Sequence, residues 1–403
     1  MRPRSYILLL ASNSQKFPTK SLKLKACKAA YHPKKSLQTR KVYKHSHFNP
    51  DAFGHGGNKR TAQIDELLIN AGITTHNVSF ENTALIKNKL PTYLAGFKHD
   101  KTKSNSHKNR YAIGRYLKLF ETFVEEQKPE FFIWESTVGY NLLLAEVLYK
   151  KNIPVIALPH NIESLVAGAK SPFTNKTSPD WLLEELKYLG YCENTFTISR
   201  EEQWLLSAAG INSQYLPYYP PHQTKSYLLE IRERKYKLQT RVSKSKNILL
   251  LGTFHNKPTF EGYVTLIKNI KHSKDIIINV AGFGSEKLND MFIDTNVKIW
   301  GSVTNDQLTE LIVNADMGVV YQEASSGALT RVPELLIAGL PLLLNTHAAR
   351  SCYDMQGIRV YNSFDELLEL LHEAPVPIPT VLNQPVEEKI FVNYLKEKIN
   401  QAI

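Results

Sequence analysis

YQEASSGALTRVPELLIAGLPLLLN, residues 321–345, follows a short apolar run at 317–321 and indicates a loop, a helix, a tight turn and a second strand. Gly339 ends the predicted helix, 328–338, and the apolar run 340–344 is typical of a buried parallel strand. Where such a strand passes into a helix, free backbone N–H groups and the helix dipole attract an anion, phosphate above all. The stretch therefore predicts a nucleotide-diphosphate site in an α/β domain.

The rest of the chain repeats this alternation of apolar strands and helices on both sides of a break at PYYPP, residues 217–221. Before the break, the predicted strands are 75–80, 131–134, 154–158 and 195–199, and the predicted helices are 61–71, 110–126, 138–149 and 200–209. After it, the strands are 247–252, 276–281, 297–300, 317–321, 340–344 and 358–361, and the helices are 258–269, 304–315, 328–338, 364–374 and 386–403. This order predicts an α/β fold of two doubly wound, Rossmann-like domains.

Length and composition agree with two domains. The chain has 403 residues, of which 42% are hydrophobic and 22% charged, as in an ordinary globular protein. The predicted parts are a basic segment at 1–50, a first domain at 51–216, a linker at 217–246, a second domain at 247–375, and a C-terminal tail and helix at 376–403. The first strand lies either at 5–11 or at 41–48, where it would form a sheet edge, and both alternatives stay open.

The net charge of +12 is concentrated at one end of the chain. Residues 1–50 hold twelve Lys or Arg and no acid, which leaves 38 of the 50 basic residues and all 38 acidic residues in 51–403. A solvated extension is the favoured interpretation. A targeting segment and a surface for anionic membrane are the alternatives. Nucleic acid is the least favoured partner, because the segment lacks the interleaved aromatic residues of a nucleic-acid groove.

The three cysteines, Cys27, Cys192 and Cys352, are widely spaced and form no CxxC pair, so they indicate neither a disulfide framework nor a zinc site. Few cysteines fit a reducing compartment. The longest apolar runs are far shorter than a membrane span. We therefore expect a cytoplasmic protein, with peripheral contact at the inner face of a membrane as the variant that the basic segment suggests.

Polar residues at predicted strand ends are the candidates for a ligand site. FGHGGNKRT, residues 53–61, is a glycine-rich loop before a helix, which suits either close approach to a ligand or a flexible turn. His160 follows the strand 154–158, and ligands of doubly wound sheets bind beyond such strand ends, which favours a site over a structural role. Ser199 is predicted to cap the next helix, with Glu202 at the capping-box position.

Several motifs in order resemble glycosyltransferase family 4, the "glycosyl transferases group 1" proteins, over about residues 53–375. The motifs are GGNKRT at 56–61, IPVIALPHNIES at 153–164, TISREEQ at 197–203, LGTFHNKPTFEG at 251–262, WGSVTNDQLTELIVNADMGVV at 300–320 and SSGALTRVPELLIAGLPLLL at 325–344. The resemblance implies two Rossmann-like domains facing across a cleft, the glycosyltransferase-B fold, with a C-terminal helix that returns toward the first domain.

The resemblance also implies a donor site on the second domain. Glu334 matches the second glutamate of the family's E-x7-E pair, which holds the ribose hydroxyls. Ser326 stands where the first glutamate is often found, and Glu323 lies near enough to substitute for it. The other implied donor contacts are Gly327 and Ala328 through their amides, Arg331 through its charge, and Gly252, Thr253, His255 and Lys257 in the facing loop.

On the first domain, His160 matches the family's histidine near the transferred sugar, and the implied acceptor-side loops include Gly56, Gly57, Asn161 and Glu163. The implied activity is sugar transfer with retention. The resemblance also implies that no metal takes part, and the sequence has no acidic DxD-type cluster that would bind one. The implied partners are a nucleotide-sugar donor and a sugar or lipid-linked acceptor, with no separate cofactor. A nucleotide-sugar epimerase and a non-catalytic binding protein of the same fold are the alternatives.

Overall fold

The structure is a computed structural model that describes residues 40–80, 89–99, 106–238, 245–273, 275–293, 296–373 and 377–400. The possible strand at 5–11 and most of the basic segment 1–50 lie outside these ranges. Among the described helices, none combines the length and the apolar character that crossing a membrane requires.

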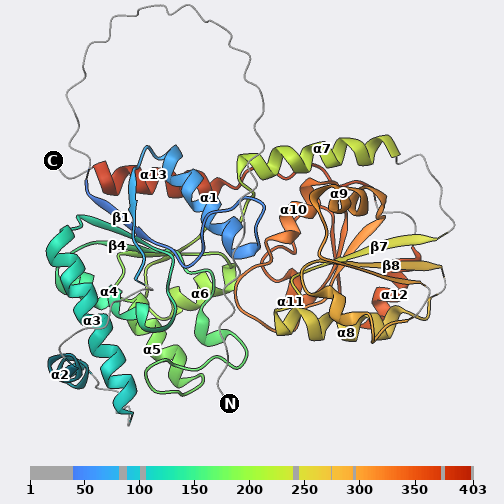
Figure 1. The fold of residues 1–403 in the computed structure, drawn as a ribbon. Coiled ribbons are helices and arrows are strands. Elements are labelled where there is room, and N and C mark those ends of the chain that lie inside the picture. Colours follow the sequence, from blue (N-terminus) through green and yellow to red (C-terminus); the bar gives the residue numbers. More distant parts are fainter. Residues whose placement is uncertain are drawn as a thin grey trace, which may run out of the picture. The chain divides into compact units, whose positions relative to one another are not determined.

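Two six-stranded parallel sheets form the framework (Figure 1). The first has the order β2-β1-β3-β4-β5-β6 and consists of β1 (Val42–His45), β2 (Thr75–Asn77), β3 (Phe131–Trp134), β4 (Val155–Ala157), β5 (Asn194–Thr197) and β6 (Ser213–Tyr215). The second has the order β12-β11-β10-β7-β8-β9 and consists of β7 (Lys246–Leu251), β8 (Ile276–Ala281), β9 (Val297–Gly301), β10 (Met317–Val320), β11 (Leu342–Asn345) and β12 (Ile358–Tyr361). The predicted fold class, two doubly wound Rossmann-like domains, is confirmed.

Helices flank both sheets (Figure 1). Those that follow strands of the first sheet are α1 (Gly56–Asn70), α2 (Lys89–His99), α3 (His107–Gln127), α4 (Leu142–Lys150), α5 (Asp180–Leu189) and α6 (Arg200–Ala208). The remaining helices are α7 (His222–Leu238), α8 (Lys257–Ile270), α9 (Asn305–Asn314), α10 (Arg331–Ile337), α11 (Thr346–Ala349), α12 (Phe364–His372) and α13 (Val386–Asn400). The sequence analysis missed α2, α5, α11 and the short polar strand β6.

Each sheet buries both faces, as parallel sheets must. Successive β3 residues alternate: Phe132 and Trp134 pack in one hydrophobic cluster, and Phe131 and Ile133 in another. The β7 residues of the second sheet divide between two clusters in the same way. The helix α13 adds Phe391 to the cluster of the first sheet, so the predicted return of the C-terminal helix is confirmed.

The strand predicted at 41–48 exists as β1, but its expected place at the sheet edge is wrong. Val42 pairs with Thr75 of β2 on one side and with Phe131 of β3 on the other. All four β1 residues are buried. The edge is instead β2, which is short and polar, features that discourage pairing with another chain.

Two helix starts differ from the prediction. The helix α1 begins at Gly56 and not at residue 61, because His55 caps it: its Nδ1 accepts a hydrogen bond from the Gly57 amide at 3.1 Å. The helix α10 begins at Arg331 and not at residue 328, and Gly327 before it has a left-handed backbone with φ +72°. Gly56 and Gly57 are therefore helical, Gly54 lies before the helix, and residues 324–330 form a loop.

Candidate active site

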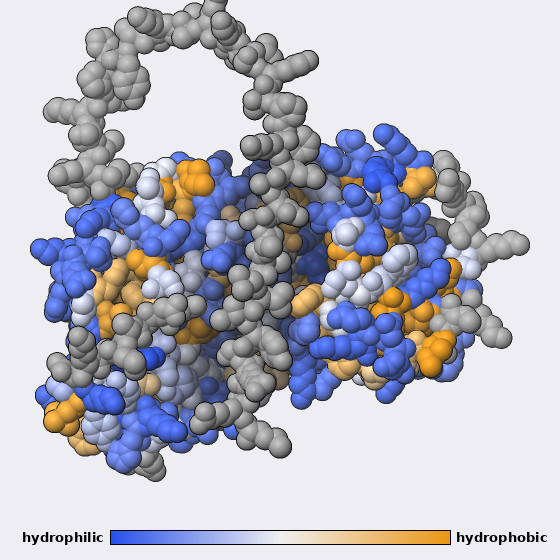
Figure 2. Space-filling view, viewed as in Figure 1, coloured by the Kyte–Doolittle hydropathy of each residue, from blue (hydrophilic) through white to orange (hydrophobic). Residues whose placement is uncertain are grey.

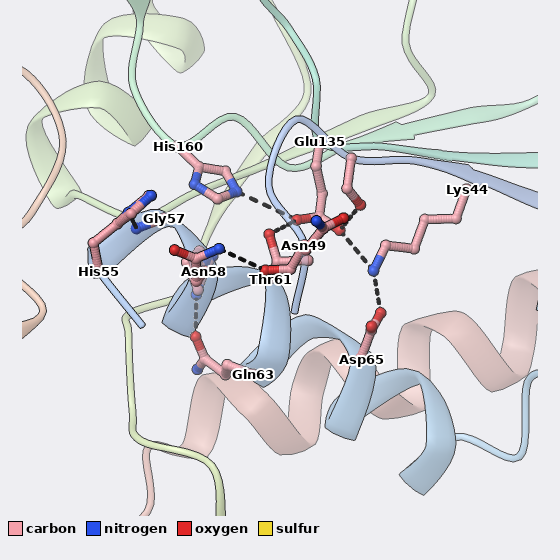
Figure 3. A network of polar contacts seen from close by, with 12 residues as sticks. Lys44, Asn49, His55, Gly57, Asn58, Thr61, Gln63, Asp65, Glu135 and His160 are labelled. Atoms are coloured by element: carbon pink, nitrogen blue, oxygen red, sulfur yellow. Dashed lines mark hydrogen bonds and ion pairs between the residues drawn. The ribbon is translucent and has the colours of Figure 1, made fainter. Parts of the chain in front are cut away.

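Glu135 directly follows β3 and is the centre of a buried polar network at the carboxyl ends of the first sheet (Figure 3). Its carboxylate accepts hydrogen bonds from three hydroxyl or ammonium groups: Ser46 Oγ at 2.7 Å, Thr61 Oγ1 at 2.8 Å and Lys44 Nζ at 3.0 Å. Lys44, buried within β1, also pairs with Asp65 of α1. The network thus connects β1, β3 and α1 next to the loops that contain the other candidate site residues of the first domain.

The charges in this network keep Glu135 ionised. Burial disfavours the carboxylate, but Lys44 and the hydrogen bond from His160 outweigh burial and lower the pKa of Glu135 to about 2. For Lys44, burial alone would lower the pKa, but the negative charges of Glu135 and Asp65 outweigh burial and raise the pKa of Lys44. Glu135 is therefore a fixed negative charge across the physiological pH range.

His160 lies where the sequence predicted, just beyond β4, and Glu135 fixes its orientation. His160 Nε2 lies 3.3 Å from Glu135 Oε2, and its ring lies against Phe48, with 5.3 Å between ring centroids. A carboxylate accepts only, so Nε2 carries the proton in this contact. The neutral ring then keeps the lone pair of Nδ1, and protonation would place the charge beside Glu135.

The glycines of the acceptor-side loop serve close packing at the start of α1. A side chain at Gly57 would overlap the ring of Phe48, and one at Gly56 would press on the hydroxyl of Thr330. Gly56 and Gly57, which were predicted to lie in a loop, thus allow α1 to pack closely against two residues. One is Phe48, which also contacts His160, and the other is Thr330, just before α10. The role of the two glycines toward an acceptor stays a prediction.

Asn161 and Glu163 follow His160 in the same loop. Asn161 Nδ2 lies 3.4 Å from Glu163 Oε1, and the amide of Glu163 donates to Glu185 Oε1 at 2.9 Å. A side chain at Gly327 would overlap Asn161 Oδ1, so the two loops touch. The structure therefore brings Asn161 to the predicted donor loop.

Glu202 joins the same two loops, which the sequence analysis did not foresee. Ser199 caps α6 as predicted, with its Oγ accepting from the Glu202 amide at 3.2 Å. The Glu202 carboxylate does not complete a capping box, however. Its Oε1 accepts from the amides of Ile162 at 3.1 Å and Gly327 at 2.8 Å. Accepting from two buried backbone amides stabilises the fold more than one capping hydrogen bond at the start of α6 would.

This contact corrects the role predicted for Gly327. Its amide is already bonded to Glu202, and its carbonyl oxygen accepts from Arg350 Nη2. Gly327 and Ala328 lie four and three residues before the start of α10 and so do not supply amides of its first turn. Both residues instead line a pocket together with Tyr218, Arg350 and Cys352.

Ser326 and Glu323, the two candidates for the sugar contact, lie in different surroundings. Ser326 Oγ is buried and has no hydrogen-bond partner among the described residues. Glu323 is exposed, and a hydrogen bond connects it to the Tyr321 hydroxyl. The role of either residue toward a sugar stays a prediction.

Arg331 is the first residue of α10, near the carboxyl ends of β7 and β10. Its guanidinium carbon lies 5.9 Å from the ring centroid of Tyr263, and a side chain at Gly252 would approach its Nη1. Its Nε and Nη2 are buried, and no described residue hydrogen-bonds to them. Because buried polar groups are nearly always paired in proteins, this guanidinium is suited to an anionic ligand.

Glu334 lies one turn further along α10 and is held by two residues of other segments. Lys59 Nζ donates to Glu334 Oε2 at 2.6 Å, and the Tyr218 hydroxyl donates to Glu334 Oε1 at 2.7 Å. Both oxygens that were predicted to bind ribose therefore have protein partners. Lys59 belongs to the GGNKRT motif, which could have pointed to it, whereas no sequence signal singled out Tyr218.

The facing loop after β7 contains the four other donor-binding candidates. Gly252 lies beside Arg331, and Thr253 is exposed. His255 stacks on Phe283, with 4.3 Å between ring centroids, and its Nδ1 lies 3.1 Å from Lys287 Nζ. Lys257 is 81% exposed and lies 3.6 Å from Glu261. The structure thus brings Gly252 to Arg331 and leaves Lys257 on the surface.

The described residues contain no group of three or more His, Cys, Asp or Glu side chains placed to hold a metal ion. The candidate site contains a guanidinium whose Nε and Nη2 have no partner among the described residues, an orienting carboxylate and a histidine. It could stabilise charge on a phosphate and position a neutral or cationic group beside it.

No protein-family model matches the sequence, and no curated protein is similar enough to count as a relative. Solved structures do share its fold. Sucrose-phosphate synthase from Thermosynechococcus elongatus matches with a TM-score of 0.57 at 13% identity, over 90% of this chain and 97% of that one. Anabaena HepE in complex with UDP and glucose matches with a TM-score of 0.54 at 12% identity, over 90% and 97%.

An α,α-trehalose 6-phosphate synthase from Burkholderia multivorans also matches, with a TM-score of 0.51 at 11% identity, over 90% of this chain and 95% of that one. At such low identity the likeness concerns the fold. The chain therefore has the two-Rossmann-domain fold of the glycosyltransferase-B type.

Proposed function

We propose that this protein is a glycosyltransferase that moves a sugar from a nucleotide-sugar donor to an acceptor, with retention and without a metal ion. The observation that carries the proposal is Arg331, whose buried Nε and Nη2 have no partner among the described residues. A guanidinium binds a diphosphate through paired, charge-assisted hydrogen bonds. Its place beside Gly252, at the carboxyl ends of the second sheet, is where ligands of doubly wound sheets bind.

The remaining donor contacts would come from neighbours of Arg331. Glu334, three residues on, has a carboxylate that can accept both hydroxyl protons of a ribose diol. It would exchange Lys59 or Tyr218 for the nucleotide. Ser326 Oγ, also buried without a described partner, could hydrogen-bond the transferred sugar.

In the proposed reaction, the bond between the anomeric carbon and the diphosphate oxygen breaks, and its electron pair stays on that oxygen. Arg331 stabilises the negative charge that develops there. The acceptor hydroxyl attacks the anomeric carbon of the oxocarbenium-like sugar from the face that the diphosphate leaves. Its proton passes to the departing phosphate oxygen. His160, fixed by Glu135, orients the sugar and need not act as a base.

The fold relatives support the choice of donor class. One of them is described in complex with UDP and glucose, and a trehalose-6-phosphate protein of TM-score 0.52 is described with UDP-2-fluoro glucose. The acceptor would be a glycan, a lipid-linked glycan or a small molecule.

A ligand screen tests the donor half of the proposal. The full chain is heated with UDP, GDP or ADP and with their hexose conjugates, because a ligand of the native state raises the melting temperature by mass action. We expect one nucleotide diphosphate to raise the melting temperature and to bind in calorimetry. If none of these nucleotides or conjugates shifts it, the proposal fails.

The occupied carboxylate of Glu334 favours a second candidate, a binding protein that no longer transfers sugar. Lys59 and Tyr218 hold both of its oxygens, and the Gly327 amide is bonded to Glu202. Nucleotide-sugar binding without release of nucleotide diphosphate, with any acceptor, would support this candidate. Conversion of the donor sugar without acceptor would instead indicate an epimerase.

A further inference from the structure

The helix α2 (Lys89–His99) has an inverted pattern of burial. Its buried residues are Thr92 and Gly96, whereas Leu90, Leu94 and Phe97 are 68%, 47% and 54% exposed. The three exposed side chains are spaced i, i+4 and i+7, so they share one face. A surface helix ordinarily buries its large apolar residues and exposes its small polar ones. Packing against the described residues therefore does not explain this face.

Close backbone contact with α3 holds α2 in this orientation. A side chain at Gly96 would overlap the carbonyl oxygen of Arg110, and one at Gly114 would overlap that of Thr92. The two helices thus touch through glycines, with no space to turn the large residues inward. The apolar face is fixed outward by the fold.

Basic residues are common in the two helices that form this surface. The described residues 89–99 and 106–120 contain six Lys or Arg and no Asp or Glu; they are Lys89, Lys98, Lys108, Arg110, Arg115 and Lys118. The guanidinium of Arg110 lies 5.1 Å from the ring centroid of Phe97. In Figure 2, orange surface lies at the lower left, where Figure 1 places α2, with blue surface beside it. Residues 51–403 as a whole are electrically balanced, so this is a local concentration.

We propose that α2 and the start of α3 dock on an anionic lipid surface. Leu90, Leu94 and Phe97 would enter the boundary between headgroups and acyl chains, while Lys89 and Lys98 would meet lipid phosphates. An apolar face alone would suit many partners, but the basic residues of α2 and of the start of α3 favour a negatively charged one. A second copy of this chain presents the same positive charge and is therefore disfavoured.

This surface is distinct from the basic segment 1–50 and does not depend on the proposed transferase activity. It would orient the folded part of the protein toward a membrane, and an acceptor held in that membrane would be within its reach.

The test uses the full chain and co-sedimentation with vesicles of phosphatidylcholine alone or with about 30% phosphatidylglycerol. We expect binding to the anionic vesicles only. The double variant Leu94→Ser with Phe97→Ser keeps every charge, including those of residues 1–50, and should bind about tenfold more weakly. The control Leu183→Ser with Trp204→Ser removes an apolar pair from α5 and α6 that is even more exposed, 67% and 70%, and it should bind as the unchanged protein does.

A second double variant, Lys89→Ser with Lys98→Ser, should weaken binding about 30-fold, from about fivefold per lysine near an anionic surface. Unchanged denaturation curves establish that each variant folds. Full binding by the Leu94 and Phe97 variant would place the membrane contact elsewhere, in residues 1–50, and overturn the proposal. Equal binding to neutral vesicles, or a dimer that this variant abolishes, would overturn it as well.

Discussion

The two halves of the candidate site differ in how fully their polar groups are paired. On the first sheet, Glu135 has four partners, and one of them is His160, which Glu135 holds in place. On the second sheet, Arg331 and Ser326 keep buried polar atoms without described partners. A fully paired network is rigid before any ligand arrives, whereas unpaired groups cost free energy that a ligand can recover. The first half is therefore suited to orienting a substrate, and the second half is suited to binding a ligand.

The largest effect should follow from Glu135→Ala, which leaves Lys44 buried and His160 unsupported. Removing one partner of a buried ion pair typically costs about 3–5 kcal/mol of unfolding free energy. Denaturant titration measures the loss. Glu126→Ala, an exposed carboxylate on α3, should change stability by less than about 0.5 kcal/mol. Equal effects of the two variants would show that the network does not stabilise the first half.

The pH dependence of stability tests the same half through His45, the last residue of β1. Burial lowers the pKa of His45 to about 4 from its ordinary 6.5. Between these values the unfolded chain binds more protons, so this contribution is complete above pH 6.5 and falls by up to about 3 kcal/mol as the pH drops to 4. His45→Phe, which keeps a ring against Phe80, should flatten the unfolding free energy over this window; a slope identical to that of the unchanged protein contradicts the prediction.

His160→Ala should separate orientation from binding. Because His160 contacts Glu135 and Phe48 and not the donor loop's Arg331, nucleotide affinity should stay within about twofold. Turnover should fall about 100-fold, the usual cost of losing a group that positions the substrate. Calorimetry and a nucleotide-release assay give the two readouts. An unaffected turnover would make His160 structural.

Arg331→Ala should have the opposite profile. Loss of its charge-assisted hydrogen bonds should weaken nucleotide diphosphate binding about 10- to 100-fold. Stability should change little, because its Nε and Nη2 bond to no described residue. Arg359→Ala, which breaks an exposed pair with Glu373, is the matched control and should bind normally. Retained affinity in the Arg331 variant would place the diphosphate elsewhere.

Glu334 should have an effect of similar size, and the smallest effect should come from Lys59, the lysine that holds it. Glu334→Ala should weaken nucleotide binding by about 1–3 kcal/mol through lost ribose contacts. Lys59→Met should strengthen binding about two- to fivefold, because Lys59 Nζ competes for the same carboxylate. Calorimetry on both variants decides. A weaker complex in the Lys59 variant would mean that Lys59 supports the nucleotide and does not exclude it.

The sequence predicted what local pattern determines. The sequence located ten of the twelve described strands, gave β1 as one of two alternatives for the first strand, and missed β6. The family resemblance implied Arg331 as a donor contact, and its buried Nε and Nη2 have no described partner. The order of motifs predicted the two-domain fold.

Features that depend on distant partners were not predictable in the same way. Glu135 directly follows a predicted strand, but the sequence analysis did not single it out, because its partners Lys44 and His160 lie far away in sequence. Glu202 matched a capping box, yet amides of two remote loops compete for its carboxylate. Local propensity cannot reveal such competition, because the stronger partner appears only once the chain is folded.

The packing of α13 has a consequence for the order in which the protein is made. Phe391 and Leu395 complete the hydrophobic cluster that contains Ile64 and Phe131 of the first half. A ribosome delivers α13 after every other described element, so the first half cannot finish folding when its own residues emerge. Its nascent core must wait, partly open, through the synthesis of the entire second half, and a stop codon before residue 386 would damage the beginning of the protein rather than its end.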